Sequence, residues 1–294
     1  MKIDNNIKGL REFFEADLAK FLHQMHDDTR LWQACDYCLT APGKRIRPVL
    51  TLMVGQMIGV PLEKLINYSA AIEFLHNSSL VHDDLPGIDN DDYRRGRLTC
   101  HKQYDEGTAI LAGDALIVLA YQLICYDSHI SNDQKQILVN ILSDAFYKLC
   151  IGQVLDLANM GHQRSDNQNV EELFLELKRR HLHKTGALMS CCFSGPAAIA
   201  GENDNKFEFL TNIGEHLGLL FQMTDDILDA QESGNTQAQD ERLGLITYVS
   251  LFGIDEARRY AKHSADEIIE KLSSFGGKAE DLKEFVRYIE SRTV

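Results

Sequence analysis

The chain has 294 residues, which is enough for one large domain or two modest ones. Its apolar content of 44% is ordinary for a protein that buries a sizeable core, and its formal net charge is −14. This acidic balance argues against nucleic acid as the main partner, so an anionic ligand would need local groups of Lys and Arg, or metal ions.

The seven cysteines are irregularly spaced and do not suggest a disulfide framework. Cys35 and Cys38 form a C-x-x-C pair, but no second pair stands at the spacing of a zinc site. We therefore expect buried thiols here in place of a zinc or redox site. No positively charged, apolar, cleavable leader opens the chain, which predicts a reduced, cytoplasmic location.

Helical periodicity runs through most of the chain. In residues 4–25, Leu10, Phe14 and Leu18 recur at four-residue steps, which predicts an amphipathic helix. Residues 143–160 and 170–193 follow the same kind of pattern, and no run of strands with hairpin turns is evident. Breaks are expected near 41–43, 59–61, 86–107, 127–133, 161–169, 201–205, 231–244 and 274–279. The sequence predicts one all-α domain over residues 1–294, with roughly ten to thirteen helices.

The most apolar run lies at residues 109–126, "AILAGDALIVLAYQLICY". It contains Asp114 and is short for a bilayer span, so no stable membrane insertion is expected. Because it is apolar all round, we expect a core helix that is buried on most sides.

Residues 80–97, "LVHDDLPGIDNDDYRRGR", place opposed charges directly after an apolar helical stretch. Asp83, Asp84 and Asp89 come first, and Arg94 and Arg95 follow them. One interpretation is a solvated loop whose charges largely neutralise each other. The other is a site that holds metal ions and a polyanion.

A second acidic cluster lies in "LLFQMTDDILDAQ", residues 219–231. Asp225 and Asp229 are spaced i, i+4 and share a helix face, while Asp226 sits about 100° round the helix. Like charges on an apolar helix become favourable when a cation lies between them. Mg²⁺ prefers such oxygen ligands, and it commonly shares one or two carboxylates with substrate phosphates.

Basic residues accompany the two acidic clusters. "GKRIRP" supplies Lys44, Arg45 and Arg47, and "HKTGAL" supplies Lys184 beside Thr185. Each cation taken alone is most simply a surface charge. Together with two aspartate clusters that could converge on one cavity, they predict a multiply charged anion, and diphosphate fits that description.

The sequence resembles the bacterial trans-prenyl diphosphate synthases, which include farnesyl and geranylgeranyl diphosphate synthases. The matching motifs run in the family's order over nearly the whole chain, from "GKRIRP" through "LVHDDLPGIDNDDYRRG", "ILAGDAL", "GQVLDL", "HKTGAL" and "FQMTDDILD" to "YIESR". The resemblance implies an isoprenoid-synthase-type helical bundle around a deep central cavity, built as a homodimer. It also implies a short-chain trans-prenyltransferase that condenses an allylic diphosphate with isopentenyl diphosphate.

The resemblance further assigns roles to residues, with three Mg²⁺ ions expected when diphosphate is bound. The implied metal ligands are Asp83, Asp84, Asp89, Asp225 and Asp229. The implied catalytic residues are these five together with Arg94, Lys184, Thr185, Gln222 and Asp226. The implied substrate-binding residues are Lys44, Arg47, His76 and Arg95 for isopentenyl diphosphate, Arg94 and Lys184 for the allylic diphosphate, and Phe221 at the cavity wall. Thr185 and Gln222 are expected to flank the reacting cation, and Gln222 also counts among the substrate-binding residues. Without the resemblance, His76 reads as a packed histidine, and the roles of Gln153 and Asp156 stay open.

Product length is expected to depend on the helix that carries the first aspartate cluster. Ser78 and Ser79 stand where the family commonly places the floor of the cavity, and both are small. The longer form of the first aspartate motif, "DDLPGID", is by contrast a stop in this family. The resemblance therefore implies farnesyl diphosphate (C15) as the main product, with geranylgeranyl diphosphate (C20) as the alternative.

The segment after the second aspartate cluster departs from the family pattern. Asn235 and Leu245 stand where the family usually has lysines that face the allylic diphosphate. This supports an alternative, a catalytically impaired homologue or auxiliary subunit that binds prenyl diphosphates. A cyclase-like enzyme is a third alternative, but the retained Lys44, Arg47, His76 and Arg95 argue against it because a cyclase needs no second diphosphate site.

Overall fold

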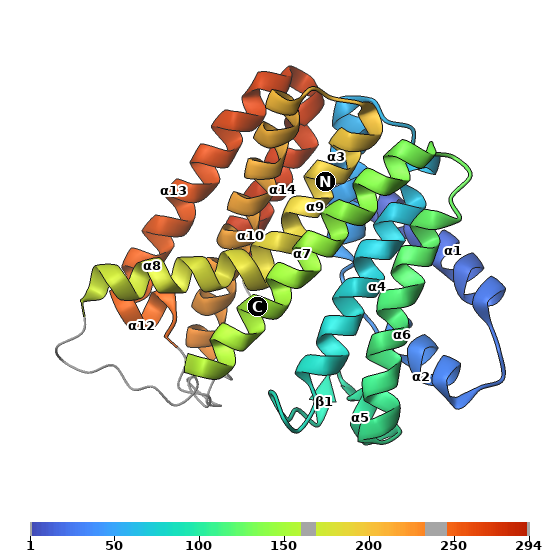
Figure 1. The fold of residues 1–294 in the computed structure, drawn as a ribbon. Coiled ribbons are helices and arrows are strands. Elements are labelled where there is room, and N and C mark those ends of the chain that lie inside the picture. The colour runs from blue at the N-terminus through green and yellow to red at the C-terminus, as the bar shows by residue number, and fades with distance from the viewer. Residues whose placement is uncertain (1, 160–168, 233–245, 293–294) are drawn as a thin grey trace. The chain divides into compact units, whose positions relative to one another are not determined.

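The computed structural model describes residues 2–159, 169–232 and 246–292 (Figure 1). Contacts between Cα atoms divide the chain into two compact units, and each is described by itself. Unit 1 comprises Met1–Asn140 and Ala198–Gly201, and unit 2 comprises Ile141–Ala197 and Glu202–Val294. A single domain over residues 1–294, built around a central cavity, stays a prediction.

Unit 1 consists of helices joined by short turns. Its elements are α1 (Lys2–Met25), α2 (Arg30–Leu39), α3 (Ile46–Ile58), η1 (Leu62–Lys64), α4 (Ile66–Asp83), β1 (Tyr93–Arg94), β2 (Arg97–Leu98), α5 (Cys100–Gln103), α6 (Glu106–Cys125) and the start of α7 (Asn132–Asn159). The expected stripe of α1 is buried, because Leu10, Phe14 and Leu18 are each less than 5% exposed. α4 and α6 pack side by side (Figure 1).

Unit 2, within its described residues, also consists of helices joined by short connections. It contains the rest of α7, α8 (Val170–His181), the π-helix η2 (Leu182–Gly186), most of α9 (Ala187–Ala200), α10 (Asp204–Glu232), α12 (Tyr248–Phe252), α13 (Ile254–Leu272), η3 (Ser273–Ala279) and α14 (Glu280–Ser291). α10 packs against α13 and α14. α12 begins with a capping box, in which Thr247 and Ser250 each bond the other's backbone N–H. The prediction of an all-α fold is confirmed.

A small hairpin interrupts the helices of unit 1. β1 pairs antiparallel with β2, with Tyr93 opposite Leu98. The two loop residues, Arg95 and Gly96, have φ angles of 53° and 77°, so both are left-handed, as a type I′ turn requires. The sequence predicts only a break at residues 86–107, because Arg-Gly is not among the residue pairs that commonly signal this turn.

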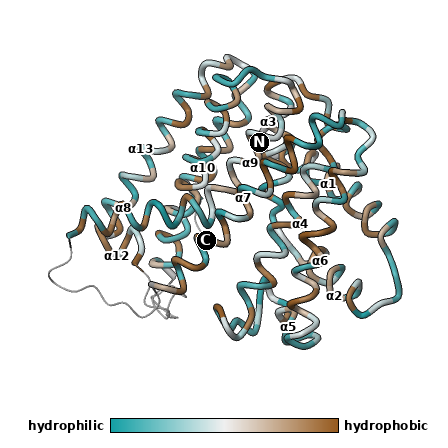
Figure 2. Tube along the Cα trace, in the orientation of Figure 1, coloured by the Kyte–Doolittle hydropathy of each residue, from teal (hydrophilic) through white to brown (hydrophobic). Residues whose placement is uncertain are grey.

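α6 departs from the expectation of a helix buried on most sides. Figure 2 shows hydrophobic residues along much of α6, yet Ile110, Leu111 and Val118 are 45%, 59% and 56% exposed. By length and composition α6 and residues Asn132–Ala158 could each span a membrane, a test that core helices of soluble proteins also pass. The expectation is wrong because, within the described residues, α2, α4 and α5 cover only part of the helix surface.

The guanidinium of Arg45 holds helices of unit 1 together. Arg45 precedes α3 with φ of 50°, a left-handed backbone that non-glycine residues rarely adopt, and the residue is only 5% exposed. Its Nη1 donates to Glu73 Oε1 of α4 at 2.9 Å and its Nε donates to Glu15 Oε1 of α1 at 2.7 Å. Its Nη2 donates to the carbonyl of Leu39, the last residue of α2, at 2.7 Å. Arg45 therefore stabilises the fold, whereas the sequence groups it with Lys44 and Arg47.

Replacing Arg45 by Met should destabilise the protein strongly, because Glu73 is 2% exposed and would lose its buried cation. Breaking a buried ion pair from one side typically costs about 3–5 kcal/mol. Urea unfolding followed by circular dichroism measures the free energy of unfolding. The double variant Arg45→Met/Glu73→Leu should regain part of the loss. A single-variant loss no larger than that of Lys20→Met, at a 67% exposed side chain, would contradict this role.

Candidate active site

The first acidic cluster lies at the C-terminal end of α4 in unit 1. Asp83 is the last residue of α4, and its carbonyl accepts a hydrogen bond from the backbone N–H of Asp89 at 2.9 Å. This bond folds the intervening loop back, so the two residues start from neighbouring backbone positions. Both are partly exposed, which leaves their carboxylates within reach of a hard cation.

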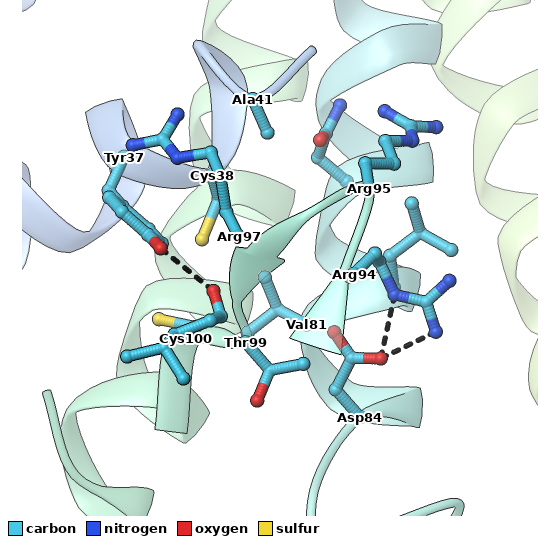
Figure 3. Close-up of a pocket in the computed structure, with 13 residues that line it drawn as sticks. Tyr37, Cys38, Ala41, Val81, Asp84, Arg94, Arg95, Arg97, Thr99 and Cys100 are labelled. Atoms are coloured by element: carbon cyan, nitrogen blue, oxygen red, sulfur yellow. Dashed lines mark hydrogen bonds and ion pairs between the residues drawn. The ribbon is translucent and has the colours of Figure 1, made fainter. Parts of the chain in front are cut away.

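Asp84 has a different environment from Asp83. It is 3% exposed, and its Oδ1 accepts from Arg94 Nε at 2.7 Å and contacts Nη2 of the same guanidinium at 2.5 Å (Figure 3). Burial raises the pKa of the Asp84 carboxyl, although the bond and charge of Arg94 oppose that change. The resemblance assigns Asp84 to metal and Arg94 to substrate, so any such ligand would compete with this ion pair.

A small cavity adjoins this ion pair within unit 1. It measures about 40 Å³ and lies between Arg94 and Cys38 (Figure 3). Cys35 and Cys38 are 1% and 9% exposed, as expected for buried thiols. Burial raises the pKa of Cys35 to about 12, so this thiol stays protonated near neutral pH.

Three of the predicted isopentenyl diphosphate ligands are electrostatically coupled in unit 1. Burial lowers the pKa of His76 well below its usual range, and the charges of Arg47 and Arg95 lower it further. Arg95 lies against Gly43, because its Nη1 is 2.7 Å from the place where a Cβ on that glycine would stand. Lys44, the fourth predicted ligand, is exposed between Gly43 and Arg45. The positive charges of Arg47 and Arg95 thus act on a neutral imidazole, and this combination favours the binding of an anion.

The second acidic cluster lies on α10 in unit 2. Asp225 and Asp229 are partly exposed, and Asp225 accepts a hydrogen bond from Arg292 near the C-terminus. The same guanidinium bonds the hydroxyl of Thr224 at 2.7 Å and lies 4.1 Å from the ring centroid of Phe221. Arg292 therefore fixes the face of α10 that carries the predicted cavity wall. The sequence signals it only as the last residue of "YIESR".

Asp226 is buried in a hydrogen-bond network, unlike the partly exposed Asp225 and Asp229 of the same cluster. It is 2% exposed, and its two oxygens accept from Gln222 Nε2 at 3.2 Å and from the backbone N–H of Tyr248 at 2.9 Å. Gln222 Oε1 in turn accepts from the hydroxyl of Thr185 at 3.1 Å. The chain of bonds orients Gln222 and Thr185, two residues predicted to flank the reacting cation.

Close backbone contacts position the π-helix η2, which carries Lys184 and Thr185. A Cβ on Gly152 of α7 would stand 2.5 Å from the backbone nitrogen of Lys184, and a Cβ on Gly218 of α10 would stand 2.6 Å from Cα of Gly186. Only glycine allows these approaches. π-Helical turns occur frequently at functional sites, and this one is held between α7 and α10.

Asp156 receives a role that the sequence leaves open. It is 5% exposed, and its Oδ2 contacts Lys184 Nζ at 2.5 Å while its Oδ1 contacts Arg180 Nε at 2.9 Å. Asp156 therefore holds the predicted allylic-diphosphate lysine. Arg180 is a residue that sequence reasoning missed, because nothing in "LKRRH" separates it from its exposed neighbours.

The predicted chain-length residues lie inside α4. Ser78 is 0% exposed, and its hydroxyl has no hydrogen-bond partner among the described residues. Ser79 is 7% exposed, and its hydroxyl donates to the carbonyl of His76 at 2.9 Å. Their role in product length stays a prediction, and Asn235 and Leu245 lie outside the described residues.

Within the described residues, no three His, Cys, Asp or Glu side chains are close enough to hold a metal ion together. Mg²⁺ nevertheless suits the donors present, because both clusters offer carboxylate oxygens without the softer ligands that other metals prefer. It commonly takes one or two protein carboxylates and completes its shell with water and substrate phosphates. The pairs Asp83 and Asp89 in unit 1, and Asp225 and Asp229 in unit 2, fit that requirement.

Comparisons with known proteins place this arrangement in a family. Residues 28–289 match the family model described as polyprenyl synthetase. The chain is 38% identical over 289 residues to the farnesyl diphosphate synthase of Micrococcus luteus, and the match covers 96% of each protein. It is 33% identical over 291 residues to the geranylgeranyl diphosphate synthase of Cyanophora paradoxa, and that match covers 96% of this chain and 94% of that protein. A solved geranyltransferase structure from Legionella pneumophila is 31% identical with a TM-score of 0.85 and covers 99% of both chains. The chain belongs to the polyprenyl synthetase family.

Proposed function

We propose that the protein is a Mg²⁺-dependent, short-chain trans-prenyltransferase that condenses an allylic diphosphate with isopentenyl diphosphate. Farnesyl diphosphate (C15) is its main product, and geranylgeranyl diphosphate (C20) is the alternative. A farnesyl diphosphate synthase and a geranylgeranyl diphosphate synthase both match nearly the whole chain. Similarity therefore supports the reaction class but does not distinguish between the two products.

The observation that carries the proposal is a cationic group in each unit. Arg47 and Arg95 act electrostatically on His76 in unit 1, and Lys184 lies on η2 in unit 2. Two diphosphate substrates need two such groups, whereas an enzyme that cyclises one diphosphate needs only one. This supports condensation over cyclisation.

The reaction breaks the C1–O bond of the allylic diphosphate and joins C1 to C4 of isopentenyl diphosphate, which then loses a proton that the departing diphosphate can accept. Bound Mg²⁺ would act as a Lewis acid toward the leaving diphosphate, with the five predicted aspartates as ligands. Lys184 contributes a fixed positive charge to the same group, and such preorganised charge stabilises the transition state. Thr185 and Gln222 present oxygen atoms to the developing carbocation.

His76 contributes a hydrogen bond in place of a charge. Its pKa is lowered well below the usual range by burial and by the neighbouring arginines, so its imidazole is neutral at neutral pH. Lys44, Arg47 and Arg95 therefore supply the positive charge for isopentenyl diphosphate.

The exposed apolar residues of α6 and α7 support the proposal of a homodimer. Leu111 and Val118 of α6, and Tyr147 and Val154 of α7, are each more than half exposed. Exposed apolar side chains of this kind, here on α6 in unit 1 and on α7 in unit 2, commonly mark a protein–protein interface. A second copy of the chain would cover them.

The second candidate is a catalytically impaired homologue that binds prenyl diphosphates or supports an active subunit. The observation in its favour is the absence of lysine at Asn235 and Leu245. Charge-assisted hydrogen bonds contribute ~1.5–3 kcal/mol each, so two missing contacts could cost several powers of ten in turnover.

Incorporation of radiolabelled isopentenyl diphosphate into geranyl diphosphate tests the proposal directly. With Mg²⁺ the wild-type protein should form a C15 product, and excess chelator should abolish it. Asp83→Ala and Asp225→Ala should each lower turnover by orders of magnitude with circular dichroism unchanged, because each removes a predicted metal ligand.

Asp255→Ala is the matched control, since this carboxylate is 91% exposed and lies outside both acidic clusters. Full activity in chelator would overturn the metal assignment. A wild-type protein that binds geranyl diphosphate but forms no product would favour the second candidate.

Restoring a cation should strengthen the allylic site selectively. Asn235→Lys or Leu245→Lys is expected to lower KM for geranyl diphosphate while KM for isopentenyl diphosphate stays unchanged. Steady-state kinetics with each substrate varied in turn measure both constants. If neither change alters the allylic constant, another group already supplies that charge.

A bulky residue at Ser78 should shorten the product. Ser78→Phe is expected to shift the product toward shorter chains, read by chromatography of the dephosphorylated alcohols. Ser78→Ala is the control, because it removes only a hydroxyl that has no partner among the described residues. An unchanged product distribution in a folded Ser78→Phe variant would show that this position does not limit the growing chain.

A further inference from the structure

Arg180 is a buried cation beside the predicted allylic-diphosphate lysine. It lies in the last turn of α8, four residues before Lys184, and it is only 4% exposed. The two preceding residues, Lys178 and Arg179, are exposed. A buried guanidinium is costly unless opposite charge and hydrogen bonds compensate it, so its position needs a physical reason.

Arg180 and Lys184 share one carboxylate. Arg180 Nε lies 2.9 Å from Asp156 Oδ1, and Lys184 Nζ lies 2.5 Å from Asp156 Oδ2. The side chains of Arg180 and Asp156 are 5% and 7% exposed, whereas that of Lys184 is 31% exposed. Lys184 is therefore the member of the trio that a ligand can reach.

The local charge depends on Arg180. Within the trio of Arg180, Asp156 and Lys184, two cations and one carboxylate sum to one positive charge, and without Arg180 the remaining pair would sum to zero. The adjacent His181 adds no charge, because burial lowers its pKa well below the usual range and the charges of Arg180 and Lys184 lower it further. In a partly buried environment, where water screens poorly, this difference acts strongly on a nearby anion.

A third contact ties Arg180 to the altered segment of the chain. Its Nη2 donates to the carbonyl of Ile246 at 2.5 Å. Ile246 directly follows Leu245, where the family pattern has a lysine. The guanidinium of Arg180 thus forms a hydrogen bond with the residue that directly follows Leu245.

We propose that Arg180 is a positioning residue for diphosphate binding, acting through Asp156 on Lys184. By neutralising Asp156 it leaves the charge of Lys184 to the substrate, and it compensates in part for the missing lysines at Asn235 and Leu245. This inference rests on the proposed function, because it takes Lys184 to face the allylic diphosphate.

Calorimetric titration with geranyl diphosphate and Mg²⁺, without isopentenyl diphosphate, tests the charge argument. Arg180→Met should weaken binding by about tenfold or more, the factor that corresponds to 1.4 kcal/mol. Asp156→Asn should bind at least as tightly as wild type. The double variant Arg180→Met/Asp156→Asn restores one net positive charge, so its affinity should return toward that of wild type.

Two matched variants separate charge from folding. Arg179→Met removes an exposed arginine one residue away and should leave binding unchanged. Arg180→Lys keeps the charge and should bind far better than Arg180→Met, while thermal unfolding verifies that each variant is folded. KM for isopentenyl diphosphate should be the same in all of them.

The double variant decides the outcome, because it lacks the contact with Ile246 as fully as Arg180→Met does. If it binds as weakly as that single variant, Arg180 acts as a structural tether and the inference is overturned. If the variants bind geranyl diphosphate with the expected ranking of affinities but the wild-type protein forms no product, the inference is supported and the proposed function is contradicted. An active enzyme with equal affinity in all variants would overturn the inference alone.

Discussion

A charge buried among apolar helices must be paired with an opposite charge, and this constraint determines how the buried charged residues of this protein are arranged. Three ion pairs meet it: Arg45 with Glu73, Arg94 with Asp84, and Arg180 with Asp156. Leaving either partner of such a pair alone would cost several kcal/mol, so each pair fixes where its two elements meet. The pairs contribute specificity of arrangement more than net stability, because hydrophobic pairs of similar volume are often as favourable.

The same pairing determines which charges remain for ligands. In "GKRIRP" the buried Arg45 serves the fold, whereas Lys44 is exposed and Arg47 acts electrostatically on His76. In unit 2, Asp156 takes up the charge of Arg180 while Lys184 stays accessible. The predicted binding residues and the structural residues are therefore of the same chemical types, and burial separates them.

Glycine and the π-helix bring the polar groups of unit 2 into contact. Gly152 and Gly218 let α7 and α10 approach η2 at distances that any side chain would prevent. This approach places Lys184 against Asp156 and Thr185 against Gln222. The irregular helix thus lies where the proposed chemistry needs orientation, as is common for π-helical turns at functional sites.

The sequence by itself determined the all-α fold and the residue types of the candidate site. Helical periodicity and the i, i+4 spacing of Asp225 and Asp229 are local properties, which one helix expresses without help from the rest of the chain. Only the tertiary structure decided that Arg180 is buried and Arg179 exposed, that Asp84 binds Arg94, and that α6 leaves an apolar face uncovered. These outcomes depend on which distant elements pack together, and burial and charge pairing arise only from those contacts.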